Sequence, residues 1–368
     1  MYAADLLDPE RFRVDVLSGP QTGSEGSLIE EVRSRGIPLT ILPNLVRQVH
    51  PYHDALAVHK IKRFIRSGNY SIVHTNSSKA GILGRLAARR VATPVIVHTV
   101  HGWSFHEHMS AAVRRLYIAM ERMAASCTDA FIVVTDQDIE KGLRAGIGTP
   151  ERYHLIRSAL PLEEFDPAEH DGGEVRDALG LPREVPVLGN IGRFSPQKNP
   201  LDWIRIAARV ARQLPECRFL LVGDGPLRAQ VEALLKQEGI AERTLLCGLR
   251  RDISRMLSAM DVFLLTSLWE GLPRVIPQAL AMEVPVVANR ADGTVEAITP
   301  DQTGFLADPG DLDALAAGCV ELLQHPEKRR AMGRLGRRHA FEKFDVRQMV
   351  QQTADLYDRL LAEKDGSP

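Results

Sequence analysis

The sequence is poor in the features by which several classes of protein are recognised. Aromatic residues make up only 5% of its 368 residues, which argues against a platform on which nucleic-acid bases would stack. The formal net charge is −1, so no excess of basic residues favours nucleic acid as a partner. No apolar run approaches the roughly 18 residues that span a bilayer, and no signal peptide opens the chain. The sequence therefore predicts a protein that is soluble or attached to a membrane surface, with no nucleic-acid partner.

Cysteine is scarce as well. The four cysteines lie far apart and form no Cys-x-x-Cys pair; they are Cys127, Cys217, Cys247 and Cys319. Three of them lie in or beside apolar runs, which is typical of buried, reduced thiols in a cytosolic protein. No Asp-x-Asp string indicates a metal site, and we expect no bound metal.

What the chain does contain is a regular alternation of strand-like and helical patterns. Predicted strands are 12–17, 37–42, 70–75, 94–99, 129–134, 153–157, 187–191, 218–222, 244–247, 261–266, 284–288 and 304–307. Predicted helices are 25–35, 53–67, 78–91, 109–126, 136–145, 311–324, 326–343 and 345–364, with further helical patterns after the strands of the second half. This alternation predicts an α/β protein with parallel sheets covered on both faces. A polar stretch at 158–186 separates two such series, and we place a domain boundary near residue 170.

The stretch SLWEGLPRVIPQALAMEVPVVA (267–288) joins a strand, a tight turn and a helix. Glu270 follows the strand-like run, and Gly271, Leu272 and Pro273 form the turn, with Pro273 expected in the first helical turn. Unpaired backbone N–H groups and the helix dipole would favour a phosphate or a sugar hydroxyl there. The alternative is an exposed glutamate at a strand end beside an ordinary helix cap.

A second strand-to-helix loop carries two cations. The string GNIGRFSPQKNP (189–200) contains Gly192, Arg193 and Lys198 before a helical pattern. An arginine that binds two oxygens and a lysine that acts as a point charge would suit a diphosphate. The motif is weak when taken alone. The later turn at 222–226 lacks the glycine spacing of a dinucleotide fingerprint, so we expect it to serve packing.

Polar clusters also end two strands of the first half. One is NSSKAGILGRLAA, whose hydroxyls would serve as helix caps, and the other is HTVHGW, which contains His98 and His101. Ligands of parallel sheets bind at the carboxyl ends of strands, and His98 is the less favoured of the two because it lies inside the strand. A lone histidine at a strand end is nevertheless more often structural.

Taken together, these motifs resemble those of the family-4 retaining glycosyltransferases of the GT-B fold. The resemblance implies two Rossmann-like domains that face each other across a cleft, spanning 1–170 and 171–344, with helix 345–364 completing the first. It implies transfer of a hexose from a nucleoside diphosphate sugar, UDP- or GDP-linked, to a glycan or polyprenyl-linked acceptor, without a cofactor. Arg193 and Lys198 would bind the diphosphate, Glu270 the sugar hydroxyls, and His101 the transferred sugar. Gly248 and Arg250 stand where relatives present backbone to the nucleobase.

The chain departs from the family's pattern in two places. Gln278 replaces a carboxylate that holds the donor ribose in relatives, so we expect weaker donor binding. The residues 1–7 resemble the end of a helix, and the strand and Gly-Gly loop that begin the relatives are not found before it. Either the true start lies upstream or part of the active cleft is lost, and the exposed sheet edge would invite pairing with another chain.

Three readings of function therefore stand side by side. The first is an active glycosyltransferase for exopolysaccharide or lipid-linked glycan assembly. The others are a non-catalytic subunit that binds a nucleotide sugar or another transferase, and a nucleotide-sugar epimerase. The basic and apolar residues of 105–126 fit a helix on the inner face of the membrane, or a sheet-covering helix with a solvated charged face. We expect a cytoplasmic protein, attached to the membrane at most peripherally.

Overall fold

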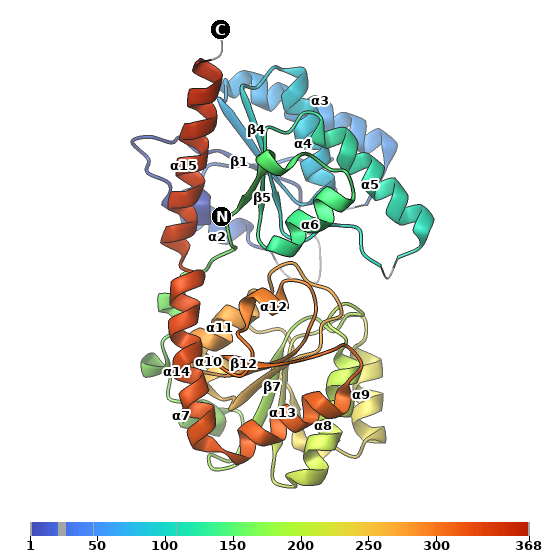
Figure 1. Cartoon of the computed structure of the whole chain (residues 1–368), viewed down its shortest axis with the longest axis vertical. Coiled ribbons are helices and arrows are strands. Elements are labelled where there is room, and N and C mark those ends of the chain that lie inside the picture. Colours follow the sequence, from blue (N-terminus) through green and yellow to red (C-terminus); the bar gives the residue numbers. More distant parts are fainter. Residues whose placement is uncertain (1, 21–26, 47, 108, 367–368) are drawn as a thin grey trace. The chain divides into compact units, whose positions relative to one another are not determined.

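The computed structural model describes residues 2–20, 27–46, 48–107 and 109–366. Its contacts divide the chain into two compact units, shown in Figure 1. Unit 1 comprises Met1–Ser158 and Val346–Pro368, and unit 2 comprises Ala159–Asp345. Each unit is an α/β structure with parallel sheets, which confirms the predicted fold class.

Unit 1 contains two separate parallel sheets. The smaller pairs β1 (Val16–Ser18) with β2 (Leu39–Ile41), and the larger has the order β3-β4-β5-β6. The larger sheet's strands are β3 (Ile72–Asn76), β4 (Val95–Val100), β5 (Ala130–Val133) and β6 (Tyr153–Leu155). The helices are α1 (Tyr2–Leu6), α2 (Ile29–Ser34), α3 (Pro51–Gly68), α4 (Ser78–Arg90), α5 (Ala111–Ala125), α6 (Asp136–Arg144) and α15 (Val346–Asp365). All six residues of β4 are buried, as expected of a strand covered on both faces.

Helix α3 shows how local sequence sets an element of unit 1. It begins at Pro51, a residue suited to the first helical position because its missing N–H would have no partner there. Ala57, Ile61 and Ile65 recur every four residues and form its buried stripe. The helix ends before Asn69, whose left-handed backbone (φ 48°) turns the chain towards β3.

Unit 2 contains one six-stranded parallel sheet in the order β12-β11-β10-β7-β8-β9. The strands are β7 (Val187–Ile191), β8 (Arg218–Val222), β9 (Thr244–Leu246), β10 (Val262–Leu265), β11 (Val286–Asn289) and β12 (Gly304–Ala307). The helices are α7 (Gly172–Ala178), α8 (Pro200–Gln213), α9 (Arg228–Gln237), α10 (Ile253–Ser258), α11 (Val275–Ala281), α12 (Thr294–Ala297), α13 (Leu312–Gln324) and α14 (Pro326–Lys343). Trp203 and Ile204 of α8 and Leu315 and Cys319 of α13 belong to one buried core over the sheet.

The division between the units falls after Ser158, before the expected boundary near 170. The backbone of Leu160 forms a β-bridge with Asp345, and Arg337 of α14 donates to the carbonyl of Phe165 at 2.9 Å. These bonds hold the first residues after Ser158 within unit 2. The polar composition of 158–186, on which the expected boundary was based, does not predict these bonds.

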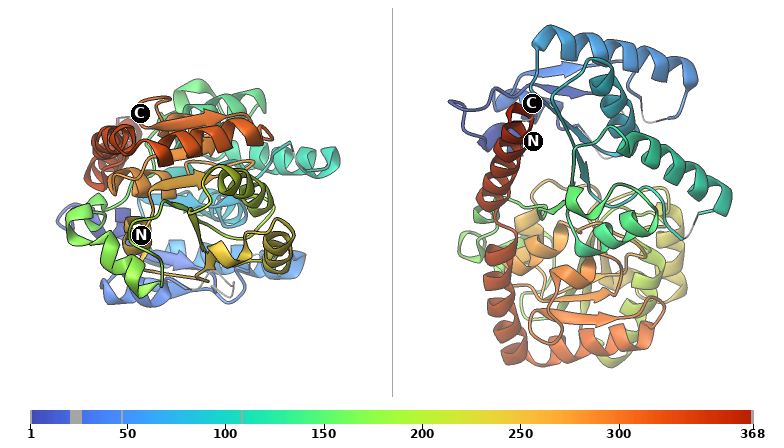
Figure 2. Two further views of the ribbon diagram at one scale, coloured as in Figure 1. Left: turned by 90° about the horizontal axis from the view of Figure 1, so that it is seen from below. Right: turned by 45° about the horizontal axis from the view of Figure 1, so that its top comes forward.

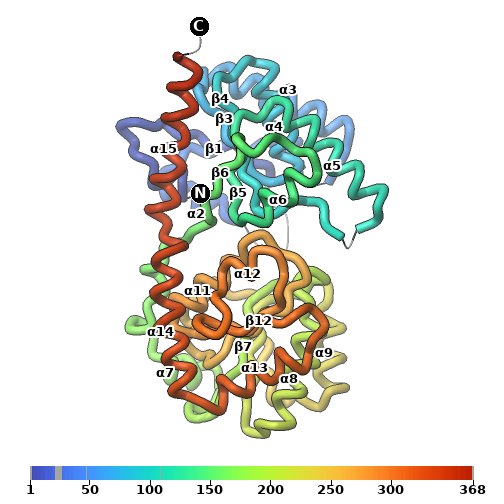
Figure 3. Tube along the Cα trace, viewed as in Figure 1, coloured from blue at the N-terminus to red at the C-terminus, as the bar shows by residue number. Residues whose placement is uncertain are grey.

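The C-terminal helix α15 belongs to unit 1 by its contacts (Figure 3). Arg11 pairs with Asp358, and Lys364 pairs with Asp129 at 2.8 Å. The ring of Phe12 lies edge-on to that of Tyr357, with centroids 5.9 Å apart. These contacts fasten α15 to the segment before β1 and to the start of β5.

Candidate functional site

The candidate site of unit 2 lies where the strand order reverses. β7 and β10 are neighbours in the sheet although two strands, β8 and β9, and three helices, α8, α9 and α10, separate them in sequence. Open α/β sheets bind ligands outside the carboxyl ends of strands at such a reversal. The loop after β7 carries Arg193 and Lys198, and the loop after β10 carries Glu270.

Hydrogen bonds hold these two loops together. Gln197 donates its side-chain amide to the carbonyl of Trp269 at 3.0 Å, and its own carbonyl accepts from the backbone of Leu268 at 2.8 Å. The hydroxyl of Thr266 donates to the carbonyl of Asn199 at 2.9 Å. Asn199 adopts a left-handed conformation (φ 47°), and the chain then enters α8 at Pro200. Lys198 is thereby placed beside the loop after β10.

Lys198 and Glu270 form an ion pair between the two loops. The Glu270 side chain is 7% exposed and the Lys198 side chain is 23% exposed. The backbone N–H of Glu270 donates to a carboxylate oxygen of Asp292 at 3.0 Å, which fixes the glutamate from a third loop. The structure therefore brings together two of the predicted site residues, one a cation and one a carboxylate.

Glycines let another loop approach this site closely. A Cβ on Gly223 (φ 137°) would lie 2.0 Å from the carbonyl oxygen of Gly192, and one on Gly225 would lie 2.5 Å from that of Phe194. The N–H of Gly192 also donates to the carbonyl of Val222 at 2.9 Å. The turn at 222–226 thus supports the loop of Arg193, as expected for a packing role. In sequence, the half-buried Arg193 lies between the residues that make these two contacts, Gly192 and Phe194.

The structure corrects the expected helix after Glu270. Helix α11 begins at Val275 and has only seven residues, so Pro273 lies before it and not in its first turn. Leu272 and Pro273 are buried, and the carbonyl of Pro273 accepts from the N–H of Ile276 at 3.0 Å. Pro277 lies inside the helix and opposes an earlier start. It has no N–H to donate to the carbonyl four residues before it, and its ring crowds that carbonyl. The backbone of Gly271–Pro273 accordingly belongs to a loop and not to the first turn of a helix.

The other residues predicted to bind the nucleotide sugar are Gly248, Arg250 and Gln278, which lie close to these loops in sequence or in space. The carbonyl of Gly248 (φ 64°) accepts from the N–H of Gly223 at 2.8 Å. Arg250 donates to Asp252 at 2.8 Å, and this hydrogen bond lowers the pKa of the Asp252 carboxyl. Gln278 is half-buried in α11.

In unit 1, His101 follows β4 and is exposed. Its Nε2 lies 3.0 Å from the side-chain oxygen of Asn76 after β3, and its Nδ1 lies 3.2 Å from the hydroxyl of Ser158. An amide oxygen can only accept, so this arrangement places a proton on Nε2 and leaves Nδ1 to accept from Ser158. Asn76 and Ser158 were not predicted from sequence, because nothing in their spacing links them to His101.

Two further histidines of unit 1, His98 and His74, lie within strands. His98 is buried beside Thr75, with Nδ1 2.9 Å from its hydroxyl, and a Cβ on Gly81 would lie 2.5 Å from the imidazole ring. Burial and, next, the charge of Arg85 lower the pKa of His98 well below its usual value. Burial and, next, His101 lower the pKa of His74 to about 4. Both are therefore neutral near pH 7.

Sequence reasoning also missed a buried ion pair in unit 1. Arg85 of α4 is fully buried and bonds Glu121 of α5 at 2.7 Å, and its Nε donates to the carbonyl of Gly81 at 3.1 Å. The sequence did offer one sign that Arg85 is buried, because it lies between Ile82 and Ala88 on the apolar face of α4. A partner 36 residues away cannot be read from helix periodicity.

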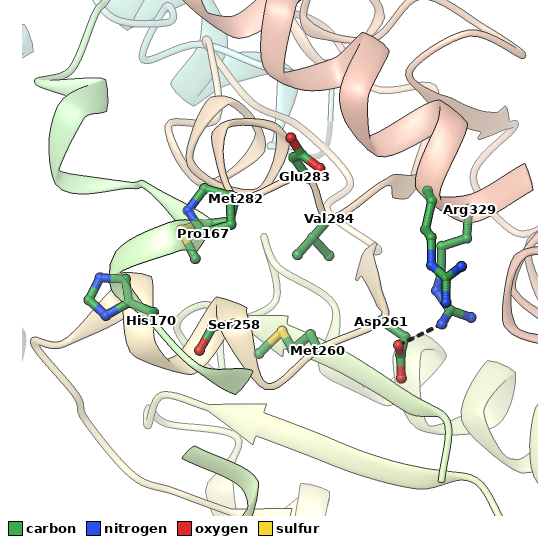
Figure 4. A pocket seen from close by; sticks show the side chains of 10 residues that line it. Pro167, His170, Ser258, Met260, Asp261, Met282, Glu283, Val284 and Arg329 are labelled. Atoms are coloured by element: carbon green, nitrogen blue, oxygen red, sulfur yellow. Dashed lines mark ion pairs between the residues drawn. The ribbon is translucent and has the colours of Figure 1, made fainter. Parts of the chain in front are cut away.

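A hollow lies in unit 2 at the amino ends of β10 and β11, the ends opposite to the loops described above (Figure 4). Its volume is about 260 Å³, and it is lined by Pro167, His170, Ser258, Met260, Asp261, Met282, Glu283, Val284, Arg329 and Arg330. Asp261, which precedes β10, pairs with Arg329 at 2.9 Å and with Arg176 at 2.8 Å, so its charge is compensated internally. It contains none of the predicted site residues. Within the described part of the chain, no group of three or more His, Cys, Asp or Glu side chains is arranged to hold a metal ion.

Known families match both units. The model for "Glycosyl transferase 4-like domain" matches residues 2–159, and that for "Glycosyl transferases group 1" matches residues 172–339. The Escherichia coli UDP-Gal:alpha-D-GlcNAc-diphosphoundecaprenol alpha-1,3-galactosyltransferase is 31% identical over 366 residues, which cover 98% of this chain and 92% of that protein. The Bacillus anthracis N-acetyl-alpha-D-glucosaminyl L-malate synthase is 29% identical over 384 residues, covering 95% and 93%.

Solved structures agree on the architecture. Anabaena Alr3699/HepE in complex with UDP and glucose has a TM-score of 0.81 at 22% identity, covering 94% of this chain and all of that one. A glycosyltransferase from Rickettsia africae has a TM-score of 0.80 at 19% identity, covering 98% and 93%. At this level of identity the likeness shows the fold.

Proposed function

Because the chain belongs to the family-4 glycosyltransferases of the GT-B fold, we propose that it transfers a hexose from a UDP-sugar to a glycan or polyprenyl-diphosphate-linked acceptor. The donor class is supported by the galactosyltransferase relative, which is named for UDP-Gal, and by the neighbour solved with UDP and glucose. The acceptor class is supported by the same relative, whose substrate is a sugar on diphosphoundecaprenol.

The observation that carries the proposal is the ion pair between Lys198 and Glu270 at the carboxyl ends of β7 and β10. A diphosphate would attract Lys198 and Arg193, and the hydroxyls of the sugar would bind Glu270 once the lysine turns to the phosphate. Lys198 and Glu270, which neutralise each other in this structure, would then each have a partner on the nucleotide sugar: the diphosphate for the lysine and the sugar hydroxyls for the glutamate. The two cations would then stabilise the charge that develops on the departing diphosphate.

We propose that transfer proceeds with retention of configuration at the anomeric carbon. The bond from that carbon to the diphosphate breaks, the acceptor hydroxyl oxygen forms its bond on the same face, and the hydroxyl proton passes to an oxygen of the departing diphosphate. Glu270 holds the sugar hydroxyls while positive charge develops on the ring, and the exposed His101 contacts the transferred sugar. Gln278 accepts from the donor ribose, Gly248 and Arg250 flank the nucleobase, and the backbone of Gly192 and of Gly271–Pro273 lines the phosphates.

The test is product analysis with a polyprenyl-diphosphate-linked N-acetylhexosamine and a set of UDP-hexoses. A disaccharide whose new linkage has the anomeric configuration of the donor, shown by NMR, supports the proposal. Inversion would refute the retaining mechanism. Isomerised donor without acceptor would instead identify an epimerase, and donor binding without turnover would identify a non-catalytic subunit.

We also propose that α5 contacts a membrane surface, where a polyprenyl acceptor resides. Figures 1 and 2 show α5 projecting from unit 1, and its side chains Val113, Leu116 and Met123 are 42%, 58% and 50% exposed beside Arg114 and Arg115. A helix with exposed apolar and basic residues suits the headgroup region. None of the described helices is long and apolar enough to cross a bilayer. Sedimentation with anionic vesicles checks this, because Leu116→Ser with Met123→Ser should abolish the binding.

A further inference from the structure

Helix α14 carries a group of arginines that line a hollow of unit 2. Arg334 lies three residues before Arg337 and four before Arg338, so the three side chains extend from one side of the helix. Together with Phe341 and Glu283 they line a hollow of about 540 Å³. All of these residues belong to unit 2. The hollow is therefore a concave and mainly cationic surface, in a chain whose net charge is −1.

Arg337 is held in place within this hollow. Its Nη1 donates to the carbonyls of Phe165, at 2.9 Å, and of Ala281. Its Nη2 lies 3.4 Å from a carboxylate oxygen of Asp166, and the guanidinium lies over the ring of Phe341, 4.9 Å from the ring centroid. A guanidinium that is already held by its own protein loses less side-chain freedom when it binds a ligand.

The other two arginines of the hollow are exposed and have no acidic partner. Among the residues that the structure describes, neither Arg334 nor Arg338 pairs with a carboxylate or donates a hydrogen bond. Other arginines of the same helix do have such partners: Arg329 pairs with Asp261 at 2.9 Å, and Arg330 pairs with Glu327 at 2.8 Å. Two of the three guanidinium groups in the hollow are therefore not neutralised by the protein.

Close packing of α14 on the turn before β11 forms one wall of the hollow. A Cβ on Gly333 would lie 2.2 Å from the carbonyl oxygen of Glu283, so the helix backbone touches this turn. Glu283 has a left-handed backbone (φ 58°) and is half-buried. It also lines the neighbouring hollow that Figure 4 shows. Its carboxylate is the acidic group of the arginine-lined hollow and weakens the attraction of that hollow for an anion.

We propose that the hollow lined by Arg334, Arg337 and Arg338 binds a soluble anion with two or more linked phosphate groups. Guanidinium groups match the oxygens of phosphate in geometry and charge. Residues three and four apart on a helix have Cβ atoms about 5–6 Å apart, so linked phosphates can meet more than one arginine.

Two observations favour a soluble anion over a membrane surface. The arginines line a hollow, and Phe341, its aromatic residue, is half-buried, whereas α5 exposes several apolar side chains beside its basic ones. The hollow also lies away from the donor loops in unit 2, because Glu283 precedes β11 while those loops follow the carboxyl ends of β7 and β10. The inference is therefore independent of the sugar-transfer reaction.

Calorimetric titration with inorganic tripolyphosphate tests the proposal. The parent protein for this test carries Arg193→Ala and Lys198→Ala, so that the donor loops do not contribute to binding. We expect it to bind tripolyphosphate, and Arg334→Gln with Arg338→Gln to weaken the binding at least about tenfold, because two charge-assisted contacts are lost. Glu283→Gln should strengthen the binding at least about twofold, because a repulsive charge is removed.

The matched control is Arg205→Gln with Arg209→Gln in α8. These arginines have the same four-residue spacing, but they pair with Asp202 at 2.7 Å and with Asp313 at 2.6 Å, so the control should bind like the parent. Equal weakening in the control would show a general effect of charge and overturn the proposal. So would a folded parent that does not bind tripolyphosphate, or an unchanged affinity in Glu283→Gln. Binding to phosphatidylglycerol vesicles through Arg334 and Arg338, without binding of tripolyphosphate, would identify a membrane surface instead.

Discussion

Removing one partner of the buried Arg85–Glu121 ion pair should strongly destabilise unit 1. Arg85 is 0% exposed and Glu121 is 2% exposed, so bulk water does not reach either charge. Breaking such a pair by removing one partner costs about 3–5 kcal/mol, because an uncompensated charge stays buried. We therefore expect Glu121→Ala to lower the free energy of unfolding of unit 1 by about this amount.

The assay is hydrogen exchange at the buried amides of β4, because the two units need not unfold together and a single melting curve would mix them. A loss of about 3–5 kcal/mol accelerates exchange by roughly two to three and a half orders of magnitude. The matched control is Glu140→Ala, whose pair with Arg144 is 64% and 77% exposed and contributes at most about 1 kcal/mol.

A double replacement separates the pair's net contribution from the penalty of breaking it. Arg85→Met with Glu121→Leu removes both charges and keeps apolar volume, so the free energy of unfolding should return towards the parent value. The reasoning fails if Glu121→Ala changes stability by less than about 1 kcal/mol, or if the double variant is less stable than the single one.

Three further predictions concern the site and the histidines. Gln278→Glu should tighten UDP-sugar binding in calorimetry by roughly five- to tenfold, because a charged hydrogen bond to the ribose is about 1 kcal/mol stronger than a neutral one; unchanged affinity would remove Gln278 from the ribose site. Gly223→Ala should weaken donor binding and lower thermal stability, since its Cβ would meet the Gly192 carbonyl at 2.0 Å, whereas Gly239→Ala, at a positive φ but with open space, should leave binding intact. The pKa of His74 is lowered to about 4 in the folded chain, so on acidification the unfolded chain takes up a proton before the folded chain does. The contribution of His74 to the free energy of unfolding is therefore full above about pH 6.5 and is lost as the pH falls towards 4. The loss amounts to at most about 3 kcal/mol. When chemical denaturation is measured across that pH range, the free energy of unfolding should change less steeply with pH in His74→Phe than in the parent. An equally steep change would show that His74 is not the group responsible.

The order of elements was predictable because strand and helix patterns are local. Among the described residues, twelve strands alternate with helices as the periodicity indicated, although several are shorter, such as β1, which begins at Val16 and not at residue 12. The separation of β1 and β2 from the larger sheet was not predictable in this form, since pairing depends on hydrogen bonds between distant segments.

Side-chain partners were the least predictable part of the candidate site. Motifs drew attention to Lys198 and Glu270 separately, but their direct pairing depends on how Gln197 and Thr266 tie the loops. The late start of α11 likewise depends on Pro277, whose ring opposes an earlier turn. The role of each predicted donor residue remains a prediction that binding measurements can test.

The most direct test of the donor site is calorimetric titration of this chain with UDP-, GDP- and ADP-hexoses. We predict selective micromolar binding of a UDP-hexose that weakens at least about tenfold in Arg193→Ala, Lys198→Ala and Glu270→Ala, each of which removes a charge-assisted contact. The control is Arg209→Ala, which removes an arginine paired with Asp313 on the outside of unit 2 and should bind like the parent. Undiminished binding by folded variants at Arg193, Lys198 and Glu270 would contradict the assignment of the donor site to the loops after β7 and β10.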